Sequence, residues 1–234
     1  MLSEAFTMEE RRIASAVIKR MPRYYRYLGQ LIDNGIKKTS SKELSALMNI
    51  TASQIRQDLN NFGCFGQQGY GYDVNSLYLE VKKILGINHA HNMIIVGCGN
   101  LGQALANYKN FGNRGFNVIG IFDKNPETFK VSIRGVSVSD IEEMPPFLKD
   151  NEVDIAVLTL PKEAVYQVAT LLVDHNVKGI WNFSGMELVL PDRSVIVENT
   201  QLTDSLMTLA YRLNDRRQLE KHRDQLRDSM KTVR

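Results

Sequence analysis

Cysteine is scarce in this chain, and its histidines are not arranged as metal ligands. The two cysteines among 234 residues, Cys64 and Cys98, lie 34 positions apart, and neither belongs to a CxxC pair. The four histidines show no H-E-x-x-H spacing. We therefore expect neither a disulfide framework nor a metal site, and the cysteine usage is typical of a reducing cytoplasm.

Long apolar runs are also missing. Runs such as Met93–Val96 and Ile155–Leu158 hold four residues each, far fewer than the roughly 18 that a membrane-spanning helix needs. The first twelve residues carry three glutamates and two arginines in place of the apolar core of a secretory signal. The sequence therefore predicts a cytoplasmic protein without a membrane partner.

Charge is present in an ordinary amount but is unevenly distributed. The formal net charge is +3, and 24% of the residues are charged. Residues 11–56 contain ten lysines and arginines against two acidic residues, whereas residues 86–200 carry a net charge of −4. This division predicts two domains with different partners. A basic block suits nucleic acid, although it can also be a solvated face.

The basic block has the pattern of a helix-turn-helix. Apolar residues recur at helical spacing over residues 7–32, with Pro22 expected to break this run into two helices. Ser40-Ser41-Lys42-Glu43 is a capping box that opens a short helix, and Thr51-Ala52-Ser53-Gln54 opens another, which runs to about residue 61. Two short capped helices after a longer one indicate a helix-turn-helix.

A β-hairpin is predicted directly after these helices. Aromatic residues alternate with glycine and polar residues from Phe62 to Tyr72, around a Gln67-Gln68-Gly69 tip. A hairpin in this position is the wing of a winged helix. A further helix is predicted from Val74 to Leu85.

From about residue 88 the pattern changes to buried strands that alternate with helices. Strands are predicted at residues 93–96, 116–122, 154–160, 179–183 and 195–198. This alternation indicates a doubly wound parallel sheet. A final helix begins at Leu202, is apolar on one face up to Leu213 and is polar all around beyond it.

A glycine-rich loop follows the first strand of this second part. The sequence Gly97-Cys98-Gly99-Asn100-Leu101-Gly102 has the G-x-G-x-x-G spacing between a strand and a helix. Asp123 ends the next strand, where a carboxylate accepts hydrogen bonds from ribose hydroxyls and repels a 2′-phosphate. We therefore predict an NAD(H) site, with Lys124 slightly weakening the preference over NADP(H). Cys98 is expected to be a packed residue rather than a thiol sensor.

Polar side chains on the second short helix suit the edges of DNA bases. Glutamine and asparagine pair with adenine and arginine with guanine in the major groove, and serine is less selective. The first short helix is expected to contact phosphates, and the hairpin tip the minor groove. The predicted DNA-binding residues are Ser40, Lys42, Ser53, Gln54, Arg56, Gln57, Gln67 and Gln68. A winged helix used for protein contacts is the alternative.

Taken in order, these motifs resemble the Rex family of redox-sensing transcriptional repressors. The matching stretches, within roughly residues 12–213, are Pro22–Leu28, Thr51–Leu59, Phe62–Tyr72, Gly97–Gly102, Ile121–Asp123, Leu160–Ala164 and Asn182–Phe183. The resemblance implies a homodimer that binds a palindromic operator when it is free or NAD⁺-bound and that NADH releases. It also implies a C-terminal helix exchanged between the partners. From the glycine motif and this resemblance, the predicted cofactor-binding residues are Gly97, Gly99, Asn100, Leu101, Gly102, Asp123, Lys124, Leu160, Pro161, Asn182 and Phe183.

Departures from that family concern the switch more than the fold. The family couples cofactor to DNA through an Arg, a Tyr and an Asp. Arg26 and Tyr108 match the first two, but Gln201 stands in the place of the Asp, with Asp204 one helical turn further on. The hairpin tip is neutral where the family commonly has basic residues, and Ser184-Gly185 replaces its Ala-Pro.

The expected fold class is therefore α/β, in three parts. A winged helix-turn-helix is assigned to residues 1–86, a doubly wound Rossmann domain to residues 87–200, and a dimerisation helix with its tail to residues 201–234. We predict a repressor and not an enzyme, because the histidines lie away from the expected ligand edge and no substrate domain remains. No catalytic residue and no protein partner other than a second copy is predicted.

Other functions compete with this prediction. One is an NAD-dependent oxidoreductase. Another is a regulator that reads a different nucleotide, such as a coenzyme A derivative. The third is a Rex-like protein with altered DNA binding or switching.

Overall fold

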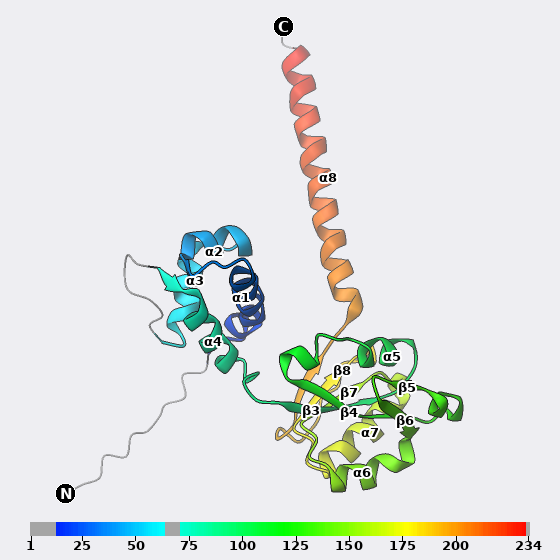
Figure 1. Ribbon diagram of the computed structural model, residues 1–234. Coiled ribbons are helices and arrows are strands. Elements are labelled where there is room, and N and C mark those ends of the chain that lie inside the picture. The colour runs from blue at the N-terminus through cyan, green and yellow to red at the C-terminus, as the bar shows by residue number, and fades with distance from the viewer. Residues whose placement is uncertain (1–12, 64–70, 233–234) are drawn as a thin grey trace, which may run out of the picture. The chain divides into compact units, whose positions relative to one another are not determined.

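The computed structural model describes residues 13–63 and 71–232, with the backbone alone for residues 224–232. The chain divides into two compact units between His89 and Ala90 (Figure 1).

The first unit is built from helices and a short two-stranded antiparallel sheet. Helix α1 packs against α4 and α2, and α2 packs against α3. Buried side chains from all four helices form one core, which includes Met21, Leu44, Ile55 and Leu77. Most of the predicted hairpin, residues 64–70 with its tip, lies outside the described residues. The elements are α1 (Ser15–Asp33), β1 (Lys38–Thr39), α2 (Ser41–Met48), α3 (Ala52–Asn60), β2 (Tyr72–Asp73) and α4 (Val74–Ile84).

Helix α1 is continuous, so the predicted break at Pro22 is wrong. Pro22 lies inside the helix and is exposed. A proline leaves the carbonyl of the residue four positions earlier without its helical partner. That residue is Ile18, which is 51% exposed. Water can therefore replace the missing N–H, and the helix continues.

The two predicted capping boxes differ in the structure. Ser40 and Glu43 form a complete reciprocal box at the start of α2. Thr51 accepts the backbone N–H of Gln54 at 3.1 Å, but the side chain of Gln54 donates from Nε2 to Asp58 at 2.8 Å. The second box is therefore half formed, because Asp58 takes the side chain that would complete it.

A buried carboxylate ties α3 to α1. Asp58 is 0% exposed, and it accepts two hydrogen bonds of 2.6 Å from Arg20, one of 3.0 Å from the Tyr24 hydroxyl and one from Gln54. Burial raises the pKa of the Asp58 carboxyl, but these donors outweigh burial, so that its pKa lies below the ordinary value. Burial, and next the nearby carboxylate, raise the pKa of Tyr24. Asp58 is therefore a charged group inside the core.

The second unit is a seven-stranded sheet in the order β5-β6-β4-β3-β7-β8-β9. Every neighbouring pair is parallel except β5 with β6. Among the parallel strands the order is third, second, first, fourth, fifth, sixth, as in doubly wound nucleotide-binding folds. The order reverses between β3 and β7, and such folds bind ligands there, beyond the carboxyl ends of the strands. The strands are β3 (His91–Val96), β4 (Phe116–Asp123), β5 (Ser132–Ile133), β6 (Val136–Asp140), β7 (Ile155–Leu158), β8 (Gly179–Asn182) and β9 (Ile196–Asn199).

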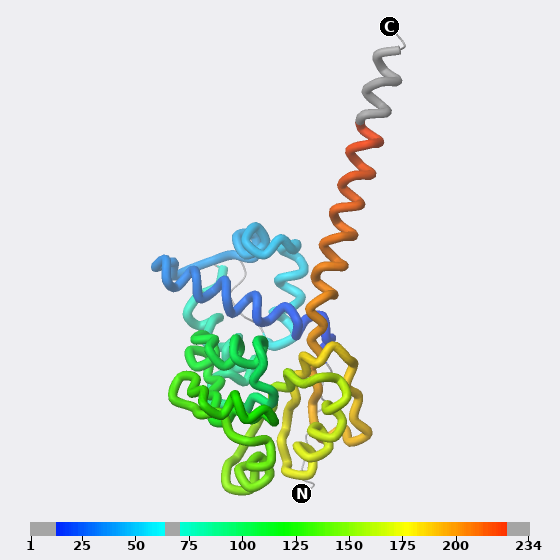
Figure 2. The backbone as a smooth tube through the Cα atoms, turned by 90° about the vertical axis from the view of Figure 1, so that its right-hand side faces the viewer, coloured from blue at the N-terminus to red at the C-terminus, as the bar shows by residue number. Residues whose placement is uncertain are grey.

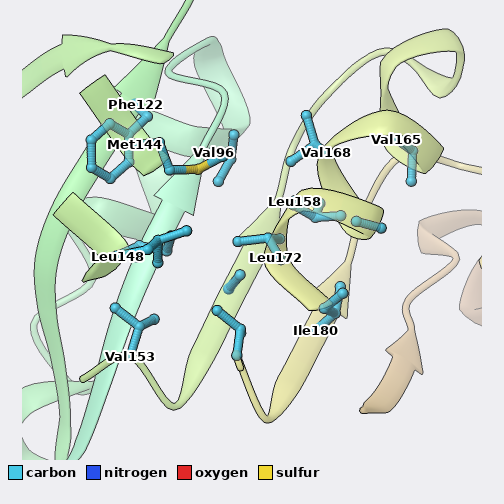
Figure 3. Close-up of a cluster of buried hydrophobic side chains, with 14 of the residues drawn as sticks. Val96, Phe122, Met144, Leu148, Val153, Leu158, Val165, Val168, Leu172 and Ile180 are labelled. Atoms are coloured by element: carbon cyan, nitrogen blue, oxygen red, sulfur yellow. The ribbon is translucent and has the colours of Figure 1, made fainter. Parts of the chain in front are cut away.

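Helices cover both faces of this sheet. Helices α6 (Met144–Asp150) and α7 (Lys162–Asp174) lie on one face, and α5 (Asn100–Ala106) lies on the other (Figure 1). Figure 3 shows side chains of α6 and α7, such as Leu148 and Leu172, beside those of the strands. The predicted α/β class, with a helix-turn-helix and a doubly wound sheet, is confirmed.

The sequence pattern predicts no element between residues 124 and 153, yet the structure has β5, β6 and α6 there. Strands β5 and β6 are short and are joined at Arg134 and Gly135, both of which have positive φ angles. Helix α6 has proline in its first turn, which is allowed there although proline usually indicates a break. Short strands and an N-terminal proline give a weak periodic signal.

The C-terminal helix α8 (Leu202–Thr232) is a single element, and the polar segment after Leu213 continues it. Figure 2 traces it without a break over its coloured part. All described side chains from Leu202 to Arg223 are exposed.

The pairing of Arg20 with Asp58 predicts a pH-dependent loss of stability in the variant Arg20→Met. At pH 7.5 the variant leaves a buried carboxylate without its cation, which costs about 3–5 kcal/mol. In the wild-type chain the lowered pKa of Asp58 contributes stability above the ordinary value of about 4, and this is lost as the pH falls further. In the variant the carboxyl can take up a proton, so the loss should be smaller at pH 5.

The measurement is amide hydrogen exchange of α1 and α3 at both pH values. Lys19→Met, at an exposed neighbouring position, is the matched control. Equal protection in the two variants at pH 7.5 would contradict a role for the pair.

Candidate nucleotide and DNA-binding sites

The loop between β3 and α5 is shaped by close backbone contacts. Gly97 has φ +100°, and a Cβ atom there would lie 2.6 Å from the carbonyl oxygen of Thr159. A Cβ atom at Gly102 would lie 1.9 Å from the carbonyl oxygen of Gly97. Only glycine fits at these two positions, and the loop can therefore pass tightly between the strand and the helix.

Gly99 differs from these two glycines because the space beside it is open. It is exposed, and a Cβ atom there would meet nothing within 4 Å. Its backbone lies directly before α5, so an incoming group can approach the start of the helix. Asn100 and Leu101 begin the first turn of α5, where Asn100 is exposed and Leu101 is half-buried.

Asp123 is fixed against this loop. It ends β4, is half-buried, and accepts hydrogen bonds from the backbone N–H of Cys98 and, at 2.8 Å, from that of Asn125. Each carboxylate oxygen keeps a lone pair for a further donor. Lys124, the next residue, is exposed.

The thiol of Cys98 does not suit redox sensing. It is 0% exposed, and burial first, then the charge of Asp123, raise its pKa. A raised pKa disfavours the reactive thiolate. This agrees with its expected role as a packed residue.

Thr159 is a loop-supporting residue that sequence reasoning missed. It follows β7, and its hydroxyl donates to the carbonyl of Gly97 at 2.7 Å and lies 3.2 Å from that of Val96. A hydroxyl residue at the carboxyl end of the strand beside the glycine loop was the available signal. Its contacts hold the loop against the point where the strand order reverses.

The other predicted cofactor residues lie at the ends of β7 and β8, where Leu160 and Pro161 come after β7, Asn182 ends β8 and Phe183 follows it. Leu160 is half-buried and Pro161, at the start of α7, is exposed. Asn182 is 1% exposed. Its amide nitrogen donates to the backbone carbonyl of Met186 and to Oδ1 of Asn199, and its amide oxygen accepts from the backbone N–H of Ser184. These bonds occupy the Asn182 amide in shaping the loop after β8. The ring of Phe183 lies 4.6 Å from that of Trp181.

The exposed face of α3 carries several of the predicted DNA-binding residues. Ser53, Arg56 and Gln57 are exposed, and Asn60, which was not singled out, is exposed as well. Arg56 donates to Ser41 of α2 at 3.1 Å. Gln54 is half-buried beside this face because Asp58 holds its amide.

On α2, Lys42 is exposed, whereas the Ser40 hydroxyl is bonded within its capping box. Gln67 and Gln68 lie outside the described residues. The structure therefore brings together the predicted residues of α2 and α3.

The two predicted switch residues belong to different units. Arg26 is exposed on α1, with its guanidinium 5.3 Å from the centre of the Tyr27 ring. Tyr108 is 49% exposed after α5, and its ring lies edge-on to that of Phe111.

An apolar groove of about 370 Å³ lies in the second unit, away from the glycine loop. Phe116, Ile155 and Ile196 line it from the starts of their strands, together with Phe111 and Trp181. It therefore lies toward the opposite end of the strands from the edge where ligands bind in this fold.

Within the residues that the structure describes, no group of His, Cys, Asp and Glu side chains is placed to hold a metal ion. In the same part of the chain, no helix is both long and apolar enough to pass through a lipid bilayer.

Two family models match this chain. The model described as "Putative DNA-binding protein N-terminus" matches residues 12–60, and the model described as "CoA binding domain" matches residues 88–186.

Curated relatives and solved structures are similar over most of the chain. The "Redox-sensing transcriptional repressor Rex" of Caldanaerobacter subterraneus subsp. tengcongensis is 55% identical over 203 residues, which are 87% of this chain and 90% of the relative. The protein of that name from Clostridium novyi is 50% identical, over 88% of this chain and 98% of its own length.

The chain in a crystal structure of RSP in complex with β-NAD⁺ and operator DNA is 52% identical in sequence to this chain, with a TM-score of 0.82. The match covers 89% of this chain and 96% of the RSP chain. A structure of RSP with β-NADH is 49% identical, with the same TM-score, over 90% and 98% of the two chains. RSP is described as a Rex-family repressor. With such identities over most of its length, this chain belongs to the Rex family of redox-sensing transcriptional repressors.

Proposed function

We propose that this protein is a transcriptional repressor that binds operator DNA when free or NAD⁺-bound and releases it when NADH binds. The observation that carries the proposal is the similarity, 52% identity over 89% of the chain, to a repressor crystallised with both NAD⁺ and operator DNA. The glycine loop with Asp123 and the polar face of α3 support the proposal as candidate sites for the nucleotide and for DNA.

At the nucleotide site, each group has a separate task. Gly99 has no side chain, so the pyrophosphate can approach the backbone there. The carboxylate of Asp123 accepts hydrogen bonds from the ribose hydroxyls, through the lone pairs that the N–H groups of Cys98 and Asn125 do not use. Its negative charge disfavours a 2′-phosphate, which is why NAD(H) is proposed over NADP(H). Thr159 keeps the loop in place, and Phe183 lies at the same edge of the sheet.

At the DNA site, α3 is the recognition helix. Arg56 suits guanine and Gln54 and Gln57 suit adenine, whereas Lys42 suits phosphate. Ser53 completes the face. Ser40 contributes chiefly by capping α2, since its hydroxyl is engaged by Glu43. Gln67 and Gln68 remain proposed minor-groove contacts.

A second copy of the chain completes the proposal. On α8, Leu202, Leu206, Leu209 and Leu213 are 63, 65, 51 and 49% exposed. The apolar groove of the second unit is a further apolar surface that a second copy of the chain can cover. Exposed apolar surface of this extent is typical of an interface. We therefore assign residues 201–234 to dimerisation, beside a DNA-binding domain at 1–86 and a nucleotide domain at 87–200.

The competing functions have less support. The relatives described above are named as repressors and not as enzymes. One family model is named for coenzyme A binding, but the solved relatives contain NAD⁺ and NADH. Because operator DNA and the NADH pool meet in the bacterial cytoplasm, the protein is proposed to act there.

Operator binding at a series of NADH/NAD⁺ ratios tests the repressor proposal. NADH should lower the affinity of the labelled operator, measured by fluorescence anisotropy, whereas NAD⁺ should not. Coenzyme A is the control ligand and should have no effect. The same affinity at every ratio would overturn the sensing function, even if both nucleotides bind.

Asp123→Ala should weaken NADH binding by about 10- to 100-fold, because hydrogen bonds to a charged acceptor are worth about 1.5–3 kcal/mol. Discrimination against NADPH should shrink as well, because the repelling charge is gone. Operator affinity without cofactor should be unchanged. Titration calorimetry measures the first two effects.

Asp140→Ala is the matched control for Asp123→Ala, since Asp140 pairs with Asp123 in register at the end of the neighbouring strand β6. Its NADH affinity should stay close to that of the wild-type chain. An equal loss in both variants would contradict a direct role for Asp123.

The double variant Leu206→Glu/Leu209→Glu should be monomeric at micromolar concentration, because it places two charges in the apolar stripe of α8. Light scattering after gel filtration measures the mass. Leu219→Glu is the control, since Leu219 is 60% exposed but lies beyond the stripe. A wild-type monomer, or a double variant that stays dimeric, would overturn the assignment.

A further inference from the structure

We propose that Asp58 is a positioning residue for base recognition, because it fixes the amide of Gln54 at the edge of the recognition helix. This inference rests on the proposed function and adds a specificity determinant to it. It depends on the hydrogen bond of 2.8 Å from Gln54 Nε2 to Asp58 Oδ1, one helical turn apart on α3.

The orientation of the Gln54 amide follows from the charge on Asp58. A lowered pKa keeps the carboxyl ionised at neutral pH, and an ionised carboxylate only accepts hydrogen bonds. The NH₂ end of the amide must therefore face Asp58. The oxygen Oε1 and one N–H are left for a ligand. An acceptor and a donor together are what adenine requires in the major groove.

The hydrogen-bond capacity of Asp58 is fully used. Each carboxylate oxygen accepts two hydrogen bonds, from Arg20 and Tyr24 at Oδ2 and from Arg20 and Gln54 at Oδ1. Because Asp58 is 0% exposed, water does not readily replace a lost partner. Gln54 therefore stays in place when α3 meets DNA, in contrast to Gln57, which is exposed.

Base preferences of four full-length chains test the proposal: wild type, Gln54→Ala, Asp58→Asn and the double variant. Selection from a randomised duplex pool with the wild-type chain defines its operator. Affinities for this operator and for single base-pair substitutions then give a discrimination ratio at each position. Asparagine at 58 can donate as well as accept, so the Gln54 amide is no longer held in one orientation.

The expected result is a loss of about tenfold in discrimination at one base pair of each half-site in both single variants. The double variant should lose no more than Gln54→Ala alone. A purely structural role for Asp58 would instead lower affinity for all duplexes and add to the effect of Gln54→Ala. That outcome would overturn the proposal.

Tyr24→Phe is the matched control, because it removes another partner of Asp58 and leaves the bond to Gln54. It should lower stability without changing base preference. If Tyr24→Phe alters the preference as Asp58→Asn does, the positioning role is wrong.

A measurement on the wild-type chain keeps the proposal testable even if Asp58→Asn fails to fold. With ¹⁵N-labelled glutamine, the side-chain amide of Gln54 should show slowed hydrogen exchange relative to exposed Gln57. Equal exchange would overturn the inference. A wild-type chain that selects no sequence would overturn the proposed function itself, whereas a selected operator with no effect of Asp58→Asn would overturn only this inference.

Discussion

The charge on Asp58 is the interaction on which the DNA-binding unit depends. A bare carboxylate inside a protein is costly, and it persists only if donors replace the water it has lost. Here the donors come from two helices, Arg20 and Tyr24 on α1 and Gln54 on α3. The need to satisfy one anion therefore fixes α3, the proposed recognition helix, against α1. It also links a stabilising contact directly to Gln54, a proposed DNA-binding residue.

In the second unit, backbone N–H groups satisfy a carboxylate that is half-buried. Asp123 is held by two N–H groups, from Cys98 in the loop and Asn125 after β4, so its position depends on the course of the chain and not on a flexible partner. The loop itself is confined by Gly97, Gly102 and Thr159. A site built in this way is preorganised, and little ordering remains to be done when a dinucleotide binds.

Features that depend on neighbours in the sequence were predictable, and features that depend on distant partners were not. The capping box at Ser40 and the glycine spacing at Gly97 are local, and the structure has both. The burial of Asp58 depends on Arg20, 38 residues away, so periodicity alone presents it as an ordinary surface carboxylate. The predicted helix break at Pro22 was wrong for the same reason. Whether a helix survives a proline depends on the exposure of the freed carbonyl, which is a property of the packed unit.

Coupling between the two proposed sites requires a difference in free energy between two geometries of the dimer that we propose. In a two-fold dimer the recognition helices must be about 34–36 Å apart to enter successive major grooves, so a change in that spacing is enough to abolish binding. A hundredfold effect of NADH on operator affinity requires only about 2.7 kcal/mol of difference in its affinity for the two geometries. The apolar stripe of α8 and the apolar groove of the sheet offer surface for such a difference, since contacts between subunits change when the dimer changes shape. Gln201 immediately precedes α8, the helix proposed to contact the partner.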